Sequence, residues 1–448
     1  MVIEKILVAN RGEIALRAIR TIKEMGKKAI AVYSKADKDA LYLKYADASI
    51  CIGEAASTGS YLNIPAIISA AEISGCDAIF PGYGFLSENQ SFVEICGHHE
   101  IKFIGPSVDA MILMSDKSKA KEVMKKAGVP VIEGSDGALK DVAQAKELAR
   151  KIGYPVIVKA SAGGGGRGMR VVEREEDMEV AYLSAENESA TAFGDGTLYL
   201  EKFIKDPRHI EVQVIGDAHG GAIHIGERDC SLQRRHQKLI EESPSFRLPE
   251  KIRQEMGEAA VRLAKAINYD SAGTFEFLLD ENNNFYFMEM NTRIQVEHTV
   301  TEAVTGLDII KLQIVLAEGD ILKMSQEDIV PYGHAIECRI NAEDTEHGFL
   351  PCPGKITKYI VPGGIGIRID SHTYQGYEIS PYYDSMIGKV IAFGMDREEA
   401  IARMKRALNE FIIEGVETTI PFHLKVLENE NYKKGNVTTA FIEKEFGL

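Results

Sequence analysis

The sequence predicts an α/β protein whose N-terminal part is a doubly wound parallel sheet. Over residues 1–115, short apolar runs alternate with segments whose apolar residues recur at helical spacing. The clearest unit runs from a strand at 6–9 through the turn 10–12 to a helix ending near Gly26, and strands follow at 29–34 and 78–80. Strand–helix–strand repetition is typical of parallel sheets with helices on both faces. The turn has a single glycine and no G-x-G-x-x-G pattern, so it does not indicate a dinucleotide site.

The 448 residues are too many for one ordinary domain. We place a first domain at 1–115, a second at 116–332 and a third at 333–448. The second contains predicted helices at 119–128 and 142–152 and a strand at 156–159. The third mixes strands at 334–341 and 354–361 with a helix at 397–411. Without a low-complexity linker, these boundaries are defined to about ten residues.

Composition excludes several classes of protein. The net charge of −15 argues against a general nucleic-acid binder, because no dominant positive field would attract phosphate backbones. No apolar run approaches the roughly 20 residues that span a bilayer, and the N-terminus lacks a signal-peptide pattern. The six cysteines include no C-x-x-C pair, which argues against a zinc site or a disulfide scaffold. We therefore expect a soluble cytoplasmic protein.

The strongest local signal is a glycine loop that follows a strand ending in Lys159. Four consecutive glycines, 163–166, precede Arg167. Such a run forms no stable element, but its bare N–H groups can approach a phosphate closely. A flexible surface loop is the alternative interpretation. The flanking cations favour a lid over nucleotide phosphates, although the Walker A pattern is absent.

A second signal is a hairpin with strands at 274–279 and 285–290 around the turn 280–284. Its register sets Glu276 nearly opposite Glu289, where two carboxylates repel. A shared divalent cation removes this conflict, and oxygen ligands from Glu276, Glu289 and Asn291 suit Mg²⁺ or Mn²⁺. The alternative is a solvated polar face. The phenylalanines of these strands favour a buried metal site.

The residues after this hairpin alternate in polarity. If the chain stays extended, Asn291, Arg293, Gln295 and Glu297 point to one face with Glu289. That face suits a small planar anion, which Arg293 would hold bidentately and Glu297 would deprotonate. The alternative is an ordinary surface strand.

A basic segment at 227–238 would supply further anion contacts. His236 and Lys238 share a face if the segment is extended, and we interpret them as contacts for phosphate and for a second small anion. A solvated helix face is the alternative. Other candidates are equally open between ligand contact and solvation or turn formation: Lys117, the strand 199–203 as an adenine wall, His209 near ribose, and the glycine-rich loop 81–89. For Arg11 and Glu13, helix-terminal charge is at least as good an interpretation as ligand contact.

Taken together, the chain resembles the biotin carboxylases, the ATP-grasp subunits of bacterial acetyl-CoA carboxylase. The resemblance runs essentially end to end. It rests on segments that would be unusual in an unrelated protein, at 6–17, 61–73, 81–89, 159–170, 227–238, 272–278, 288–298, 337–344 and 381–389. It implies an ATP-grasp fold with an N-terminal doubly wound parallel-sheet domain, a mobile lid at 132–202 and a C-terminal α+β domain.

The resemblance also implies a role for each candidate residue. ATP phosphates would contact Lys117, Lys159, Gly164, Gly165 and Gly166. Adenine and ribose would lie against Glu201, Lys202, His209, Gln233, His236 and Leu278. Magnesium or manganese, as two ions, would bind Glu276, Glu289 and Asn291. Bicarbonate would bind Lys238, Arg293, Gln295, Val296 and Glu297, with Glu297 as the base. Arg339 would stabilise the biotin enolate, and Tyr83 would line the biotin site.

The implied reaction carboxylates biotin through carboxyphosphate. No lysine lies in a biotin-accepting M-K-M context, so we expect a separate biotin carboxyl carrier protein and carboxyltransferase subunits as partners. A homodimer is expected through Arg20, Glu24 and Arg368, although Ile365 replaces an aromatic there, and Thr299 stands where the family usually has proline. Acetyl-CoA carboxylase is the first choice of complex, ahead of a two-subunit pyruvate carboxylase or another acyl-CoA carboxylase. Two further hypotheses stay open: another ATP-grasp carboxylate–amine ligase, and a nucleotide-sensing subunit without activity.

Overall fold

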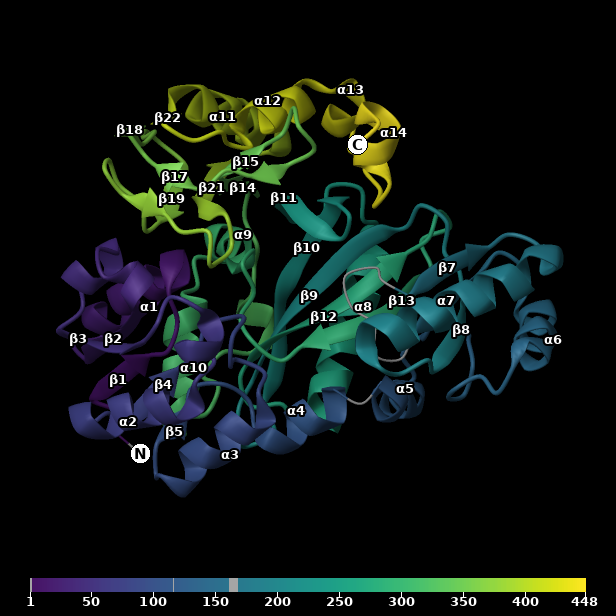
Figure 1. Ribbon diagram of the computed structural model, residues 1–448, viewed down its shortest axis with the longest axis horizontal. Helices are drawn as coiled ribbons and strands as arrows, with labels where there is room; N and C mark the ends of the chain where they lie inside the picture. The colour runs from purple at the N-terminus through teal and green to yellow at the C-terminus, as the bar shows by residue number, and fades with distance from the viewer. Residues whose placement is uncertain (1, 116, 161–167) are drawn as a thin grey trace.

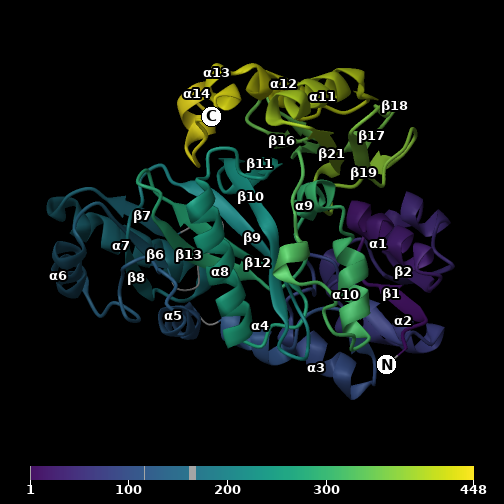
Figure 2. The same ribbon diagram turned by 180° about the vertical axis from the view of Figure 1, so that it is seen from behind.

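The computed structural model describes residues 2–115, 117–160 and 168–448. Figure 1 shows an N-terminal unit in purple and blue, a long central sheet in teal and green, a unit projecting beside it that carries β6 to β8, and a C-terminal unit in yellow above. Figure 2 shows from behind that α8 lies across the central sheet. None of the helices in the described residues is both long and apolar enough to cross a membrane.

The N-terminal unit is a parallel five-stranded sheet in the order β3-β2-β1-β4-β5. Its strands are β1 (Lys5–Val8), β2 (Lys28–Ser34), β3 (Ala48–Gly53), β4 (Ala78–Phe80) and β5 (Lys102–Phe103). Its helices are α1 (Gly12–Glu24), α2 (Ile64–Ser74), α3 (Gln90–His98) and α4 (Val108–Ser115). Apolar side chains of α1 pack on one face of the sheet, and those of α2 and α3 on the other. The predicted doubly wound arrangement is therefore confirmed.

The central sheet has eight antiparallel strands in the order β13-β12-β9-β10-β11-β14-β21-β19. Its strands are β9 (Arg208–Gly216), β10 (Ala222–Arg234), β11 (Gln237–Ser243), β12 (Ala272–Leu279), β13 (Phe285–Asn291), β14 (His334–Asn341), β19 (Ile367–Ser371) and β21 (Met386–Gly394). Helix α8 (Glu250–Ala266) buries its apolar stripe against β9 and β12, and α9 (His298–Thr305) and α10 (Ile309–Ala317) follow the hairpin. Because β11 pairs with β14, the sheet runs without a break across the boundary predicted at 332/333.

The projecting unit has a core of its own. A three-stranded sheet in the order β7-β6-β8 is made of β6 (Val156–Ala160), β7 (Met169–Val172) and β8 (Leu198–Lys202). It packs against α6 (Val142–Ile152) and α7 (Met178–Phe193), and α5 (Lys117–Lys126) precedes it. Its apolar cluster is separate from the cores of the other units.

The C-terminal unit completes the sheet and covers its end. Its remaining elements are β15 (Glu343–Asp344), β16 (Leu350–Pro351), β17 (Gly354–Lys355), β18 (Lys358–Ile360), β20 (Glu378–Ile379), β22 (Ile412–Glu414), α11 (Arg397–Glu410), α12 (Ile420–Glu428), α13 (Glu430–Lys433) and α14 (Phe441–Phe446). The single strand predicted at 354–361 is wrong: β17 pairs with β20 and β18 with β22, in two separate two-stranded sheets. Buried Arg397 donates two hydrogen bonds to Glu242 of β11, at 2.6 and 2.8 Å, which ties α11 to the central sheet.

The hairpin that carries Glu276 depends on the aromatic core beneath it. Phe277 is fully buried, with its ring centroid 5.6 Å from that of Phe285 and 6.3 Å from that of Phe287. We expect Phe277→Ala to lower the free energy of unfolding by about 3–5 kcal/mol, because it removes buried contacts and leaves a cavity. Urea unfolding followed by circular dichroism measures this. Val330→Ala, at a side chain 75% exposed, is the control and should change it by no more than about 0.5 kcal/mol. Equal unfolding midpoints for the two variants would contradict the expectation.

Candidate active site

The site begins with a strand whose side chains alternate in polarity. Along β9, the polar residues His209, Glu211 and Gln213 alternate with Ile210 and Val212, so the polar set shares one face. All are buried. The apolar set faces the core under α8, and the polar set faces the site.

Three neighbouring strands place carboxylates side by side on that face. Glu276 of β12 pairs in register with Glu211 of β9 on one side and with Glu289 of β13 on the other, the second pairing as predicted. Residues directly opposite on adjacent strands point to the same face, and like charges there repel. Glu211 and Glu276 are buried, whereas Glu289 is exposed. This row of carboxylates provides an oxygen-rich edge of the kind that divalent cations bind.

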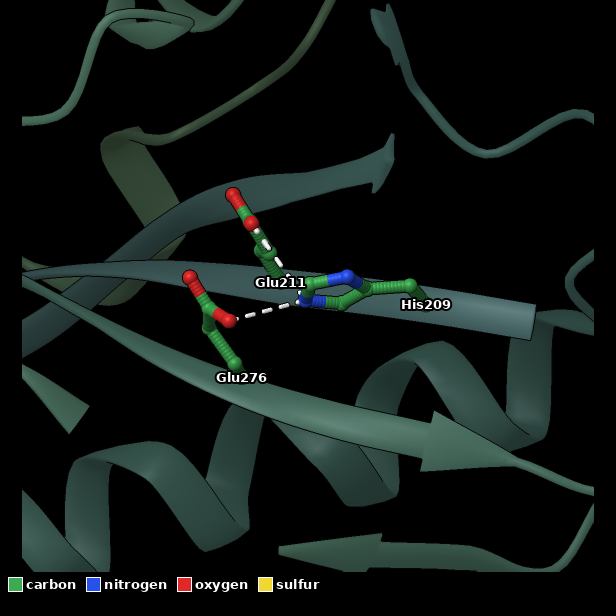
Figure 3. A group of neighbouring side chains, drawn as sticks. All are labelled: His209, Glu211 and Glu276. Carbon is green, nitrogen blue, oxygen red and sulfur yellow. Dashed lines mark ion pairs between the residues drawn. The ribbon is translucent and has the colours of Figure 1, made fainter. Parts of the chain in front are cut away.

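His209 lies between two of these carboxylates (Figure 3). Its Nε2 is 2.9 Å from Glu276 and 3.5 Å from Glu211, and the three side chains are close enough to hold one ion together. Burial acts to lower the pKa of His209, but the charge and hydrogen bond of Glu276 together with the charge of Glu211 raise it above its usual value. Gln233 lies 3.5 Å from the other ring nitrogen. Leu278 pairs in register with His209 on the same side of β12 as Glu276, which brings three of the predicted nucleotide contacts together.

Lys238 is the centre of the buried charge cluster. From β11 its ammonium donates to Glu211, to Glu276 at 3.1 Å and to Glu297 at 2.7 Å. Burial would lower the pKa of Lys238, but the three carboxylates hold it well above its usual value. The lysine therefore carries its charge and is the cation that these carboxylates share.

The carboxylates of the cluster differ in their affinity for a proton. Burial raises the pKa of Glu211 to about 7 against the opposing charge of Lys238. Burial also acts to raise the pKa of Glu276 and of Glu297, yet both pKa values lie well below the usual range. Lys238 and His209 together lower that of Glu276, and Lys238, Arg339 and Arg228 together lower that of Glu297. Glu276 and Glu297 are therefore ionised at neutral pH.

Two arginines complete the cluster. Fully buried Arg228 donates to Glu211 at 3.1 Å and to Gln295 at 2.8 Å. Arg339, from β14, donates to Glu241 at 2.6 Å and to Glu297 at 2.9 Å. Glu297 is thus held between Lys238 and Arg339, one on each carboxylate oxygen.

The segment 289–297 gathers as predicted but not in the predicted conformation. It does not stay extended: β13 ends at Asn291, and Glu297 already precedes the first residue of α9. The bend turns Gln295 back toward the hairpin, where Gln295 and Asn291 each donate to Glu276 at 2.7 Å. Arg293 donates to Asn291 at 2.8 Å and to Glu88 at 2.9 Å.

The residues predicted to contact the nucleotide phosphates and adenine lie on the projecting unit. Lys159 and Lys121 each lie 2.6 Å from Glu201, and although burial opposes it, the two lysines lower the pKa of that carboxyl to about 2. Glu201 and its neighbour Lys202 lie on opposite faces of β8, and Lys202 donates to the carbonyl of Gly153 at 2.8 Å. The two side chains predicted to share the adenine contact therefore do not point together. Gly164, Gly165, Gly166 and the side chain of Lys117 lie outside the described residues.

The predicted extended segment around His236 is also wrong. Arg235 and His236 form the turn between β10 and β11, with φ of 49° and 67°. His236 is exposed there while Lys238 lies in the buried cluster, so the two do not share a face.

Tyr83 approaches the site from the N-terminal unit. Asn10, at the end of β1, holds the loop by donating to the carbonyls of Pro81 and Tyr83, at 2.7 and 2.8 Å. The hydroxyl of Tyr83 donates to Glu13. Glu13 is 4% exposed, so the structure places it inside this assembly and not on a solvated helix end.

Several residues of the site were not predicted from the sequence: Glu211, Arg228, Glu241, Lys121, Glu88 and Lys389. The alternation along β9 is a signal that would have found Glu211. Arg228 stands in the basic segment that was singled out. Glu88 lies in the glycine-rich loop 81–89 that was also singled out, although its contact with Arg293 was not foreseen. For Lys121 we see no local signal, because its partner Glu201 lies far away in the sequence.

Comparison with known proteins agrees with this architecture. Three family models match in succession: "Biotin carboxylase, N-terminal domain" at 2–111, "Carbamoyl-phosphate synthase L chain, ATP binding domain" at 116–325, and "Biotin carboxylase C-terminal domain" at 337–444. Biotin carboxylase 1 of Bacillus subtilis is 57% identical over 442 residues, 98% of each chain.

Solved structures are also similar to this chain over its full length. A biotin carboxylase–β,γ-ATP complex from Campylobacter jejuni is 66% identical, with a TM-score of 0.95 and 99% of each chain covered. The biotin carboxylase domain dimer of the Hydrogenobacter thermophilus 2-oxoglutarate carboxylase, in complex with MgADP, ADP and bicarbonate, is 51% identical with a TM-score of 0.93, covering 99% of this chain and 98% of that one. The predicted resemblance and ATP-grasp fold are confirmed, and the chain belongs to the biotin carboxylase family of ATP-dependent ligases.

Proposed function

We propose that this chain carboxylates the biotin of a separate carrier protein, with ATP and bicarbonate as substrates and Glu297 as the base. The observation that carries the proposal is the position of Glu297, which is 2% exposed with Lys238 on one oxygen and Arg339 on the other. A carboxylate acts as a base when the acid whose proton it removes lies within hydrogen-bond reach, and the two cations beside Glu297 would attract an anionic acid such as bicarbonate to that position. The Hydrogenobacter thermophilus relative binds MgADP and bicarbonate, which supports this assignment.

The charge cluster explains how Glu297 becomes a base. In the free protein, Lys238 and Arg339 hold its pKa low, which makes it a weak base. A bicarbonate ion beside Lys238 and Arg293 would share the charge of Lys238, so the pKa of Glu297 would rise toward the range useful for proton abstraction. Substrate binding therefore activates the base, and the residue stays unreactive while the site is empty of substrate.

The remaining steps are part of the same proposal. The deprotonated bicarbonate attacks the γ-phosphorus of ATP, ADP leaves, and the carboxyphosphate that forms breaks down to CO₂ and phosphate. Phosphate removes the N–H proton of biotin, the guanidinium of Arg339 stabilises the negative charge that develops on the biotin oxygen, and the biotin nitrogen attacks CO₂ to form carboxybiotin. Lys159 and the glycines 164–166 would hold the ATP phosphates, and closure of the lid at 132–202 would exclude water from carboxyphosphate.

The residues present fit a divalent cation. Three carboxylates stand in register on β9, β12 and β13. The amide of Asn291 lies beside them: its nitrogen donates to Glu276, and its oxygen, which accepts from Arg293, would serve as a ligand after the amide rotates. We propose Glu276, Glu289 and Asn291 as ligands of two Mg²⁺ or Mn²⁺ ions, which would neutralise the charge of the phosphates. His209, Gln233, His236 and Leu278 would contact the nucleoside.

The assembly is also a proposal. We place the chain in the cytoplasm as a homodimer that serves acetyl-CoA carboxylase, acting with a biotin carboxyl carrier protein and carboxyltransferase subunits. Ile365, expected at the dimer contact, is 81% exposed and available to a partner. Arg368 donates within the chain, to Asp370 and to Glu302 at 2.7 Å, and its side chain is 32% exposed. The proposed dimer contact therefore keeps Arg20, Glu24 and Arg368, with Ile365 beside them. A pyruvate or other acyl-CoA carboxylase remains the alternative complex.

We predict that Glu297→Gln abolishes bicarbonate-dependent ATP hydrolysis while ATP binding survives. The amide keeps the size of the side chain but accepts no proton, and the general-base contribution of about 10²–10⁴-fold is lost. ADP release with and without bicarbonate, together with titration calorimetry with ATP, measures both properties. Glu417→Gln, at an exposed residue, is the matched control and should behave as wild type. Normal turnover of the Glu297 variant would refute the base assignment.

We further predict that chelation of divalent cations abolishes the activity and that Mg²⁺ or Mn²⁺ restores it. Glu276→Gln removes one proposed ligand charge and should raise the metal concentration for half-maximal activity by about tenfold or more, by analogy with the loss seen when groups that merely support metal ligands are removed. Metal titrations of ADP release measure this shift. An unchanged metal requirement would show that Glu276 is not a ligand.

A further inference from the structure

We propose that Glu13 and Lys389 are positioning residues that hold the bicarbonate and biotin sides of the active site in register. The inference rests on the proposed function and concerns two buried residues to which no role was assigned above. Glu13 is 4% exposed on α1, and Lys389 is 0% exposed on β21. They come from opposite ends of the chain and meet at 3.3 Å beneath the site.

Lys389 fixes the turn that carries the base. Its ammonium donates to the carbonyl of Val296 at 2.5 Å, one residue before Glu297. Lys389 also pairs in register with Arg339 across β21 and β14, so both side chains point to one face. Two adjacent cations therefore hold consecutive residues: Lys389 holds the backbone of Val296, and Arg339 holds the side chain of Glu297. Movement of this turn would shift both the base and the proposed bicarbonate contact at Val296.

Glu13 connects this turn to the biotin side. The same carboxylate oxygen that faces Lys389 accepts the hydrogen bond of Tyr83. A charged acceptor makes a stronger hydrogen bond than a neutral one, so the ionised pair fixes the phenol ring of Tyr83. A continuous contact path thus runs from Tyr83 through Glu13 and Lys389 to Val296. It joins the N-terminal unit to β21 and to the turn before α9.

Burial shows that this arrangement is more than a surface contact. A buried lysine is costly unless carboxylates surround it, and here Glu13, Glu337 at 4.0 Å and Asp370 opposite it in register provide the negative charge. Thr299 fixes Glu337 in turn, because its hydroxyl donates to that carboxylate. A proline at 299 would offer no such donor. A methionine or leucine pair could fill this space without the desolvation cost of buried charges. We therefore infer that the charges serve to orient the site.

The test is a comparison of Lys389→Met with Lys358→Met. The first removes the donor to Val296 with little change in volume, and the second removes a half-buried lysine of the same unit that pairs with Glu414 at 3.0 Å, away from the site. We expect Lys389→Met to raise KM for bicarbonate by about tenfold or more, the usual effect of losing a hydrogen bond from a charged donor, with KM for ATP within about twofold. Lys358→Met should leave both unchanged. Parallel changes in the two KM values, or wild-type kinetics, would overturn the inference.

A second variant serves as the control that separates a loss of stability from a loss of positioning. Glu13→Gln/Lys389→Met removes both charges of the pair, so it should recover thermal stability relative to Lys389→Met while the KM for bicarbonate stays raised. Recovery of that KM together with stability would mean that the pair is merely structural. If Lys389→Met does not fold, Glu13→Gln alone carries the test: it should raise KM for free biotin about threefold or more, a larger factor than its effect on KM for bicarbonate in the ATP hydrolysis measured without biotin. Equal effects on the two reactions would overturn the inference.

The proposed function is tested separately in the same assays. Wild-type ADP release must depend on bicarbonate. Its failure would count against the proposed function, whereas failure of the positioning role is visible only as a difference between variants.

Discussion

The contact of Lys238 with three carboxylates is the interaction on which the site depends. Glu211, Glu276 and Glu297 come from β9, β12 and the turn before α9, and without a shared cation their charges would repel in a buried space. The lysine holds them within reach of one another and keeps two of them ionised. In the mechanism we propose, an anionic substrate would compete for the same ammonium, and Glu297 would become a stronger base when the substrate binds.

The continuous central sheet explains how distant parts of the chain can build this cluster. β11 carries Lys238 and pairs with β14, which carries Arg339, so the proposed bicarbonate contact and the proposed biotin contact stand on neighbouring strands. The N-terminal unit adds Tyr83 through a loop anchored by Asn10 and through the buried Glu13. The unit with β6 to β8 keeps its own apolar core, which suits a part that moves as a body over ATP.

Sequence reasoning was most successful where a local pattern determines geometry. The turn 280–284 between two apolar runs set Glu276 opposite Glu289, and the alternation of strands and helices gave the parallel sheet. The predictions were wrong where the backbone departs from regular strand geometry. The segment 289–297 was expected to be extended, but its bend brings Gln295 back to Glu276, and the positive φ values at Arg235 and His236 separate His236 from Lys238. Contacts such as that of Arg293 with Glu88 join residues about 200 positions apart, which no local pattern encodes.

A crystal structure with a non-hydrolysable ATP analogue, Mg²⁺ and bicarbonate tests the central claim most directly. The account predicts metal density between Glu276 and Glu289, and a planar anion that contacts Lys238 and Arg293 within reach of Glu297. Metal bound elsewhere, or an anion-free site in which Lys238 still contacts all three carboxylates at saturating bicarbonate, would contradict it.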